Sequence, residues 1–306
     1  MTSDRSTTIV VPTRNRAELL PRALRSALSQ TYRELDVIVV DDASTDGTQA
    51  VVQGFADPRL RYVRHAEQRG AAAAKNTGLA LAEGAYVSFL DDDDEYPPDR
   101  TAVLARRLDR SSDRTAFAYA KTEVLVDGRH SHVHPETARP TLTFSEYLSG
   151  RRFTGACTLF RRAAIPSFDE ALPPLEFSDL ILRVLRHHDA AFVDAIALTY
   201  HADRRRPRMT IDGRLQDALR LQAERHLPGT SRSVRAGFYT QAGFHSMGNS
   251  NRRWLTSKCF ARASLLWPTP WNLARFCASL GGSRWVERYQ TGAAKVAAWT
   301  ARRRQS

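Results

Sequence analysis

Cysteine is scarce in this 306-residue chain, and long apolar runs are absent from it. Its three cysteines, Cys157, Cys259 and Cys277, stand far apart and form no C-x-x-C pair, so neither a disulfide framework nor a zinc site is indicated. No stretch approaches the roughly 18 uninterrupted apolar residues of a membrane-spanning helix, and the run before Pro12 is too short for a signal-peptide core. We therefore expect a cytoplasmic protein that is not integral to a membrane.

Glycine is missing from the first strand-to-helix turn, where two nucleotide-binding folds require it. The turn reads VPTRNRAELL, and no G-x-G-x-x-G follows it, which disfavours a dinucleotide-dependent oxidoreductase. The phosphate-binding loop of P-loop nucleotidases is absent as well. A sugar nucleotidyltransferase remains an alternative, but it would normally carry a glycine-rich loop with Arg or Lys at this position.

Acidic residues are scarce only in the last third of the chain. Residues 1–202 contain 25 Lys or Arg against 28 Asp or Glu, whereas residues 203–306 contain 20 against 5. This basic tail predicts an anionic partner, such as phospholipid head groups, a phosphorylated acceptor or nucleic acid. Because no nucleic-acid-binding motif is present, we expect no nucleic acid partner.

Tryptophan is concentrated in the same tail, interleaved with Arg and Lys, at Trp254, Trp267, Trp271, Trp285 and Trp299. These side chains either seat the tail peripherally at the inner face of a membrane or pack its helices onto the rest of the protein. The second interpretation is favoured because amphipathic helix faces usually meet a core.

The first 110 residues contain a regular alternation of apolar strands and amphipathic helices. The pattern predicts strands at 7–11, 35–40, 60–63 and 86–90. It predicts helices at 17–28, 48–55, 71–82 and 98–108. This alternation predicts an α/β fold, Rossmann-like, with a mostly parallel sheet covered by helices on both faces. Ligands of such sheets bind beyond the carboxyl ends of the strands, so the residues that follow strands are the informative ones.

Two regions are predicted to follow this alternating half. Residues 111–203 carry shorter strands than the alternating half at 1–110. Together we expect them to make one domain, 1–203, followed by a basic helical region at 204–306. Amphipathic helices in that last region are separated at 228–229, 268, 270 and 281–282.

Four consecutive aspartates, Asp91 to Asp94, follow the fourth predicted strand in the sequence FLDDDDEYPPD. Adjacent carboxylates repel, so their clustering costs free energy unless a proton or a hard cation compensates. Mg²⁺ or Mn²⁺ takes one or two protein carboxylates and completes its shell with water and substrate phosphates. The run predicts a divalent cation that binds a nucleoside diphosphate. A solvated acidic loop that caps the next helix is the alternative.

Two further motifs accompany the aspartate run. VIVVDDASTDGT ends a buried strand with Asp41 and Asp42, which can bind a base, a ribose or the cation. RGAAAAKNTGLALAEG opens a helix of small residues, whose backbone can approach a ligand closely and whose N-terminus favours phosphate. Each is weak alone, because receiver domains also place two aspartates after a strand and the helix could simply be tightly packed.

Taken in order, these motifs resemble the inverting family 2 glycosyltransferases of GT-A fold, over roughly the first two thirds of the chain. The resemblance implies transfer of a sugar, with inversion, from a nucleoside-diphosphate donor, by default a UDP-sugar, to an acceptor hydroxyl. It also implies Mn²⁺ or Mg²⁺ as cofactor, and it makes 1–203 the catalytic domain, with a nucleotide-sugar-binding half at 1–110 and an acceptor-side half at 111–203. The acceptor would be a saccharide, a lipid-linked saccharide or a small natural product.

The resemblance further implies which residues form the donor site. Those expected to contact the donor are Pro12, Thr13, Arg14, Asn15, Asp41, Asp42, Lys75, Asn76, Asp91 and Asp92. Asp91 and Asp93 match the family's D-x-D pattern, with Asp93 as the direct metal ligand and Asp91 beside it. His201 resembles a position near the donor diphosphate and is the third expected metal ligand.

The catalytic base is where the chain departs from the family. The family supplies it from a Glu-Asp pair that opens a helix, before a pattern like D-L-x-x-R, and this chain reads LPPLEFSDLILRV. Glu176 is present, but Phe177 stands where the second acid is expected. Glu176 is the first candidate base and Asp179 the second, with helix capping as the alternative role of both. If neither serves, the chain is a catalytically degenerate scaffold that binds sugar nucleotides or a membrane.

Overall fold

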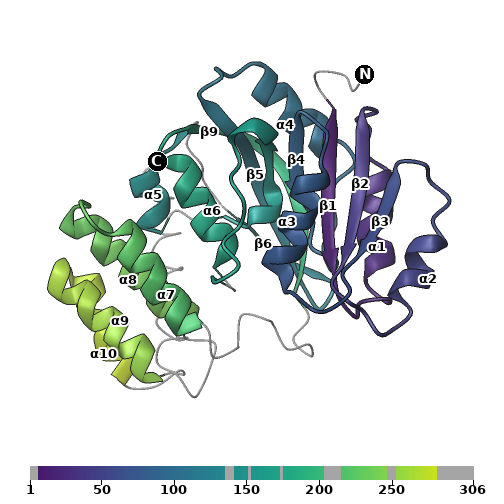
Figure 1. Ribbon diagram of the computed structural model, residues 1–306. Helices are drawn as coiled ribbons and strands as arrows, with labels where there is room; N and C mark the ends of the chain where they lie inside the picture. The colour runs from purple at the N-terminus through teal and green to yellow at the C-terminus, as the bar shows by residue number, and fades with distance from the viewer. Residues whose placement is uncertain are drawn as a thin grey trace. The chain divides into compact units, whose positions relative to one another are not determined.

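The contacts of the chain divide it into two units, 1–144 with 152–208, and 145–151 with 209–306. The computed structural model describes residues 6–134, 141–150, 153–172, 175–202, 215–246 and 253–280 (Figure 1). In this described part, the first unit contains the sheet, and the second contains the four helices of the basic tail. The short helix α5, Phe144–Leu148, begins at the boundary between the units, and the sequence did not predict that its segment belongs with the tail helices.

Nine strands of the described residues form one sheet. They are β1 Thr7–Thr13, β2 Leu35–Asp41, β3 Leu60–Arg64, β4 Tyr86–Phe89, β5 Thr115–Val126, β6 Arg129–His134, β7 Thr141–Leu142, β8 Thr158–Arg161 and β9 Asp189–Ala202. Their order is β3-β2-β1-β4-β8-β5-β9-β7, and β6 pairs with β5 outside this path. Strands β3, β2, β1 and β4 are parallel neighbours, as the alternating pattern predicted.

Helices connect the parallel strands and cover the sheet. Those of the first unit are α1 Leu20–Leu28, α2 Thr48–Gln53, α3 Ala71–Leu81, α4 Arg100–Asp109 and α6 Glu176–Leu185, with short 3-10 helices at Gly155–Cys157 and Arg162–Ala164. The connections β1-α1-β2 and β3-α3-β4 cross the sheet in opposite directions, so right-handed crossovers place α1 and α3 on opposite faces. Figure 1 shows α3 in front of β1, on which it packs. The predicted α/β, GT-A-like architecture is confirmed.

Two strands of the second half are longer than the sequence predicted. β5 has 12 residues and β9 has 14, and the two pair in parallel with register shifts between Thr115 and Phe117, between Tyr119 and Lys121, and at Thr122. A register shift exchanges the inward and outward faces of a strand. The first six residues of β5 are all buried, so apolar and polar residues do not alternate along them, and the strand looked short in the sequence.

The centre of the sheet is fully buried and closely packed. Every residue of β1 and of β4 is buried, so both faces of these strands are covered. Helix α3 approaches β1 so closely that a Cβ atom added to Gly78 would lie 2.2 Å from Cγ1 of Val10. The small residues of α3 therefore serve this close packing, whatever else they do.

Replacing Gly78 by alanine is expected to lower the free energy of unfolding by about 1–3 kcal/mol, because the added methyl group overlaps Val10 and forces α3 away from β1. Urea unfolding followed by far-UV circular dichroism measures the loss. Gly47→Ala is the matched control, since its Cβ would meet only Ala17 Cβ, at 3.8 Å. Equal stability of the two variants would contradict the close packing of α3 on β1.

Four helices of the basic tail are described: α7 Leu215–His226, α8 Arg232–Ser246, α9 Arg253–Leu266 and α10 Pro270–Leu280. The predicted breaks at 228–229 and at 268 and 270 are confirmed, and the one at 281–282 lies outside the described residues. Helix α9 packs on both α8 and α10. Within the described ranges, none of the helices has the length and apolar character needed to cross a membrane.

Candidate functional site

The carboxyl ends of β1, β2 and β4 meet at one edge of the sheet, because these strands are parallel neighbours. The loops that follow them carry three of the predicted motifs. Oγ1 of Thr13, at the end of β1, donates a hydrogen bond to Oδ2 of Asp92 over 2.7 Å. The turn after β1 and the aspartate run are therefore in direct contact, although Thr13 and Asp92 are 79 positions apart in the chain.

Asn15 fastens the loop after β1 to the loop after β2. Its backbone N–H donates to Oγ of Ser44 over 2.9 Å, and its Oδ1 accepts the backbone N–H of Thr45 over 2.7 Å. Asn15 has a φ of 51°, in the left-handed region that asparagine tolerates better than most residues. Arg14 is exposed beside it, whereas Pro12 is buried in β1.

Asp41 shapes the turn after β2. Its carboxylate is fully buried, where it accepts the backbone N–H of Ser44 over 2.7 Å and the hydroxyl of Tyr62. Burial and the bond to Asp41 both raise the pKa of the Tyr62 phenol. The turn holds Ala43 at a φ of 59°, a conformation that costs free energy. The bonds to Asp41 therefore support a strained turn at the edge of the site.

Asp42 positions the start of α3. Its two oxygens accept the backbone N–H groups of Arg69 and Gly70 over 2.8 Å each, and Oδ1 lies 2.8 Å from Nδ1 of His65. Burial alone would raise the pKa of Asp42, but the hydrogen bonds from Arg69, His65 and Gly70 outweigh it and lower the pKa. Gly70 has a φ of 96°, which suits glycine. Asp42 is thus held ionised where the chain turns into α3.

The aspartate run forms a turn that is joined to β9. The backbone N–H of Asp94 donates to the carbonyl of Asp91 over 3.1 Å. Glu95 and Thr199 exchange backbone hydrogen bonds of 3.1 and 2.9 Å, and the backbone N–H of His201 donates to Oδ1 of Asp94 over 3.0 Å. Asp94 is fully buried, and its Oδ2 has no partner among the described residues.

Burial and mutual repulsion act on the carboxylates of the run. Burial, reinforced by Asp93 and Asp91, raises the pKa of Asp92 to about 7, against the opposing effects of Thr13 and Arg16. Burial is also the main cause that raises the pKa of Asp91 and of Asp94. The nearby cations Arg16 and Lys75 therefore do not offset the burial and repulsion of Asp92 and Asp91, which is the condition that a divalent cation relieves. Carboxylate oxygens are also the donors that Mg²⁺ and Mn²⁺ prefer, so these residues fit such a cation.

Lys75 and Glu176 form a buried ion pair beside the run. Nζ of Lys75 lies 2.9 Å from Oε1 of Glu176, and both side chains are almost fully enclosed. Burial would lower the pKa of Lys75, but the charges of Glu176 and Asp91 outweigh it and raise the pKa. Oε2 of Glu176 is buried without a hydrogen-bond partner among the described residues. One oxygen of this carboxylate is therefore fixed by lysine while the other is unused.

Phe177, which stands where the family has its second acid, is packed among aromatic side chains. Its ring packs edge-on against Phe89 and Phe168, with centroid distances of 5.7 and 5.1 Å, and Nζ of Lys75 lies 5.0 Å from its centroid. A Cβ atom on Gly155 would lie 2.2 Å from the Phe177 ring. The glycine thus provides the space for an aromatic ring where the family has a carboxylate.

Asp179 and Asn76, both predicted site residues, are engaged in structural hydrogen bonds. Asp179 is fully buried and accepts a bond of 2.7 Å from Nε of Arg183, one helical turn onward. The Asn76 amide donates to the carbonyl of Phe168 over 3.0 Å and accepts its N–H over 2.7 Å. Their roles in catalysis and donor binding stay predictions, with Asp179 the weaker candidate base.

His201 lies next to the aspartate run, as predicted. Its Nε2 is buried, 3.5 Å from Oε1 of Glu95, and has no hydrogen-bond partner in the described part of the chain. Burial is the main cause that lowers the pKa of His201, and the charge of Arg22 acts in the same direction. A neutral imidazole with an unused ring nitrogen is compatible with the predicted metal ligand, which stays a prediction.

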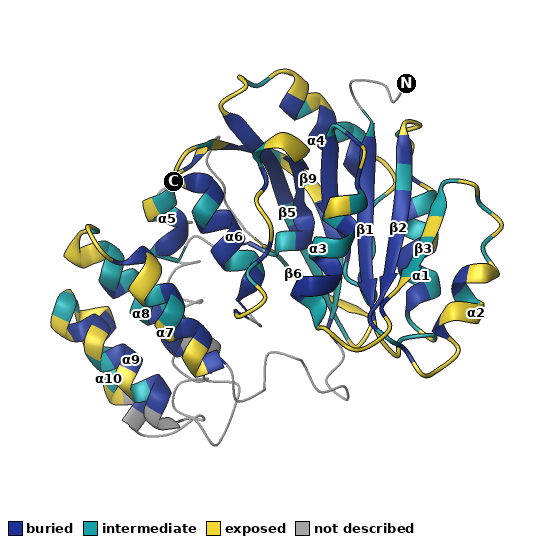
Figure 2. Ribbon diagram, viewed as in Figure 1, coloured by how far each residue is buried: buried dark blue, intermediate teal, exposed yellow. Residues whose placement is uncertain are grey.

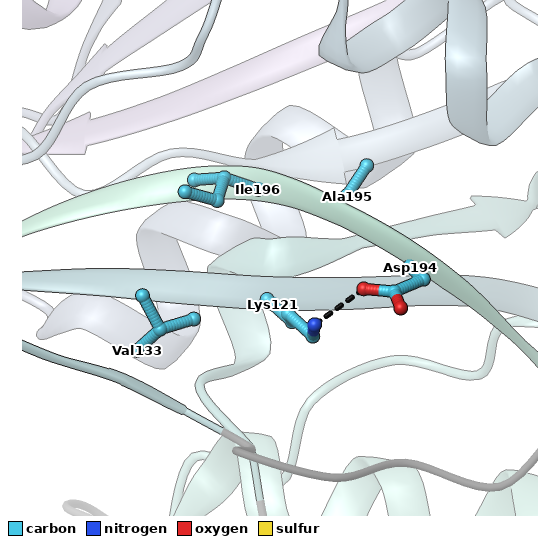
Figure 3. A pocket seen from close by; sticks show the side chains of 5 residues that line it. All are labelled: Lys121, Val133, Asp194, Ala195 and Ile196. Carbon is cyan, nitrogen blue, oxygen red and sulfur yellow. Dashed lines mark ion pairs between the residues drawn. The ribbon is translucent and has the colours of Figure 1, made fainter.

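A separate hollow on the first unit has a different character. It is lined by Lys121 of β5, Val133 of β6, and Asp194, Ala195 and Ile196 of β9 (Figure 3). Lys121 and Asp194 form an ion pair across it, which leaves no net charge to attract a phosphate. The chemistry of the predicted site lies at the strand ends and not in this hollow.

Several residues that hold the site were not predicted from the sequence. Tyr62 and His65 fix the two aspartates after β2, and Arg22 pairs with Glu95 over 3.1 Å while it bonds the Asp93 carbonyl. Polar side chains at the end of β3 were the available signal for the first two. Nothing local in the sequence connects Arg22 to the aspartate run 71 positions away.

The class of protein that this fold and site define is the GT-A glycosyltransferases. The model of the family described as Glycosyl transferase family 2 matches residues 8–167, which is more than half of the chain. The chain therefore belongs to the family 2 glycosyl transferases, as its motif order predicted.

Individual proteins are similar to this chain, one in sequence and two in fold. The succinoglycan biosynthesis protein ExoO of Rhizobium meliloti is 34% identical over 179 residues, which are 54% of this chain and 51% of ExoO. The chain thus matches about half the length of this relative. Among solved structures, S. aureus TarS 1-349 in complex with UDP superposes with a TM-score of 0.66 and 19% identity, covering 94% of this chain and 92% of that one. The mannosyltransferase PcManGT from Pyrobaculum calidifontis, in complex with GDP-Man and Mn²⁺, gives a TM-score of 0.53 and 22% identity, covering 94% and 79%.

Proposed function

We propose that this glycosyltransferase transfers a sugar from a UDP-sugar to a saccharide hydroxyl, with inversion, aided by Mn²⁺ or Mg²⁺. The observation that carries the proposal is the buried carboxylate of Glu176, which Lys75 fixes through Oε1 while Oε2 has no partner among the described residues. Its charge is one of the causes that raise the pKa of Asp91, after burial and the charge of Asp93. A base and a phosphate-binding edge thus occur in one site.

Support for the donor comes from the strand ends and from similar folds. The loops after β1, β2 and β4 meet where parallel α/β sheets bind nucleotides. The TarS structure of similar fold contains UDP, and the mannosyltransferase contains GDP-Man. The succinoglycan name of ExoO supports a saccharide acceptor.

Asp93 and Asp91 are the residues that would hold the cation. A metal bound there supplies a positive charge that stabilises the diphosphate leaving group. Among the described residues, no three His, Cys, Asp or Glu side chains are grouped to hold a metal ion. Ligation by one or two carboxylates, completed by water and donor phosphates, is the usual arrangement for Mg²⁺. The Mn²⁺ in the mannosyltransferase structure supports the same choice of cation.

Glu176 would act as the base through Oε2. It accepts the proton of the acceptor hydroxyl as that oxygen attacks the anomeric carbon from the face opposite the diphosphate, which inverts the configuration there. Lys75 orients the carboxylate through its bond to Oε1. The rings of Phe177 and Phe168 pack against each other and against Phe89, and their centroids lie 5.0 and 5.6 Å from Nζ of Lys75.

A catalytically degenerate scaffold is the second candidate, and Phe177 is the observation that favours it. The ring occupies the place of the second acid, so any catalysis depends on Glu176 or Asp179. Release of UDP from UDP-sugars with Mn²⁺ present, with and without saccharide acceptors, distinguishes the two. A chain that binds UDP but never releases it from UDP-sugars is a scaffold.

UDP with Mn²⁺ is expected to raise the melting temperature by several degrees, because a ligand that binds only the folded state stabilises it. Asp93→Ala should abolish this shift, since it removes the direct metal ligand. Differential scanning fluorimetry with UDP, GDP and dTDP, each with Mn²⁺ or Mg²⁺, measures the shift and identifies the nucleotide. Asp99→Ala, an exposed aspartate outside the run, should respond like the wild type. A wild-type chain that responds to none of the three nucleotides would not have the proposed donor site.

A further inference from the structure

The turn between α9 and α10 exposes four large apolar side chains. Leu265 is 79% exposed, Trp267 49%, Trp271 50% and Leu273 47%. Of the large apolar side chains in the described residues, only Ile196, on the first unit, is also exposed, at 37%. Exposed residues are visible along α9 and α10 in Figure 2. These four residues, named here the apolar turn patch, concentrate exposed apolar surface at one place in the tail.

Positive charge flanks the apolar turn patch. Residues 263–274 read ASLLWPTPWNLA, without a charged side chain, and Arg262 and Arg275 stand at the two ends. The region that contains the patch, 203–306, holds 20 Lys or Arg against 5 Asp or Glu. An apolar surface with tryptophans, flanked by cations, is complementary to the interface of an anionic membrane, where indole rings prefer the head-group level.

The backbone of the turn is already satisfied by its own hydrogen bonds. The carbonyl of Trp267 accepts bonds of 2.8 Å from Nδ2 of Asn272 and from the backbone N–H of Thr269. The N–H of Asn272 donates to Oγ1 of Thr269 over 3.1 Å, and Pro268 and Pro270 carry no N–H at all. Entering an apolar environment costs free energy for each unpaired backbone group. This turn would carry few unpaired backbone groups into an apolar environment.

We propose that the apolar turn patch docks the protein on an anionic lipid surface. Trp267 and Trp271 lie at the head-group level, Leu265 and Leu273 reach into the acyl boundary, and Arg262, which is exposed, contacts lipid phosphates. The contact is peripheral. It goes beyond the proposed sugar transfer and does not depend on it, because it uses residues of the tail helices alone.

Flotation of the full chain with phosphatidylcholine vesicles, with and without phosphatidylglycerol, tests the proposal. The wild type should bind the anionic vesicles, and high salt or removal of phosphatidylglycerol should weaken the binding. The double variant Trp267→Ser, Trp271→Ser should lose binding by about tenfold or more, because two large apolar side chains no longer leave water. Ile196→Ala is the matched control and should bind like the wild type.

A second measurement keeps the test independent of folding defects. Lipids brominated near the head-group end of their acyl chains should quench the intrinsic fluorescence of the bound wild type, which places tryptophan at the head-group level of the membrane interface. UDP binding, followed in parallel, shows whether the double variant is folded and whether the donor proposal fails separately. No binding of the wild type, or undiminished binding of the double variant, overturns the proposal. A third outcome also overturns the proposal: sedimentation shows that the wild type is a dimer that does not bind vesicles, and that the double variant is a monomer. The patch would then join two copies of the chain.

Discussion

Glu176→Gln is expected to lower kcat for sugar transfer by about 10³-fold, within the range that general bases contribute. Glutamine keeps the size of the side chain and can still contact Lys75, but it cannot accept the proton of the acceptor hydroxyl. Binding of UDP and the metal should change little, because the donor motifs lie on the loops after β1, β2 and β4. Turnover measured by UDP release, beside UDP affinity measured by calorimetry, separates the two effects.

The control for Glu176→Gln is Asp179→Asn on the same helix. Asp179 is bonded to Arg183, so its replacement should cost stability and leave kcat within a few-fold of the wild type. The reverse result, with kcat lost in Asp179→Asn and kept in Glu176→Gln, would move the base one turn along α6. If both variants turn over like the wild type, neither carboxylate is the base.

Arg100→Leu is expected to lower the free energy of unfolding by about 3 kcal/mol. Arg100 is almost fully buried, where it donates to Oγ of Ser88 over 3.1 Å and to the carbonyls of Ala156 and Thr158. Its guanidinium carbon lies 3.9 Å from the ring centroid of Tyr96. Leucine fills part of the volume but leaves these acceptors without their donor. Urea unfolding monitored by circular dichroism gives the difference.

Arg106→Leu is the matched control for Arg100→Leu, because Arg106 is exposed on the same helix α4. Its replacement should change stability by no more than about 0.5 kcal/mol. A similar small change in Arg100→Leu would mean that the buried guanidinium contributes no more than an apolar side chain of its size.

The placement of the predicted donor-site residues at one edge of the sheet was predictable, because these residues lie at or directly after the ends of strands. Thr13, Asp42 and Asp91 each follow an apolar run, and parallel pairing brings such positions to one edge. The sequence also predicted Lys75 near this edge, since the third motif opens a helix after β3. The local sequence pattern was therefore sufficient to predict the position of a residue wherever that position follows from the order of the strands.

The contacts that complete the site were not predictable from local pattern. The partner of Lys75 is Glu176, 101 positions away, and no periodicity connects the two. Arg100 reads as a surface residue at the start of an amphipathic helix, but α4 turns it inward to carbonyls of the second half of the sheet. The sequence showed that Phe177 replaces an acid, but it did not show that Gly155 provides the space for the ring.

The long separation of Lys75 from Glu176, and of Asp94 from His201 across 107 positions, bears on how the enzyme comes into being. A growing chain that has emerged only through the aspartate run carries its repelling carboxylates without Glu176 and without the β9 backbone that bonds to Asp94. The last partners of the candidate site are therefore added late in synthesis.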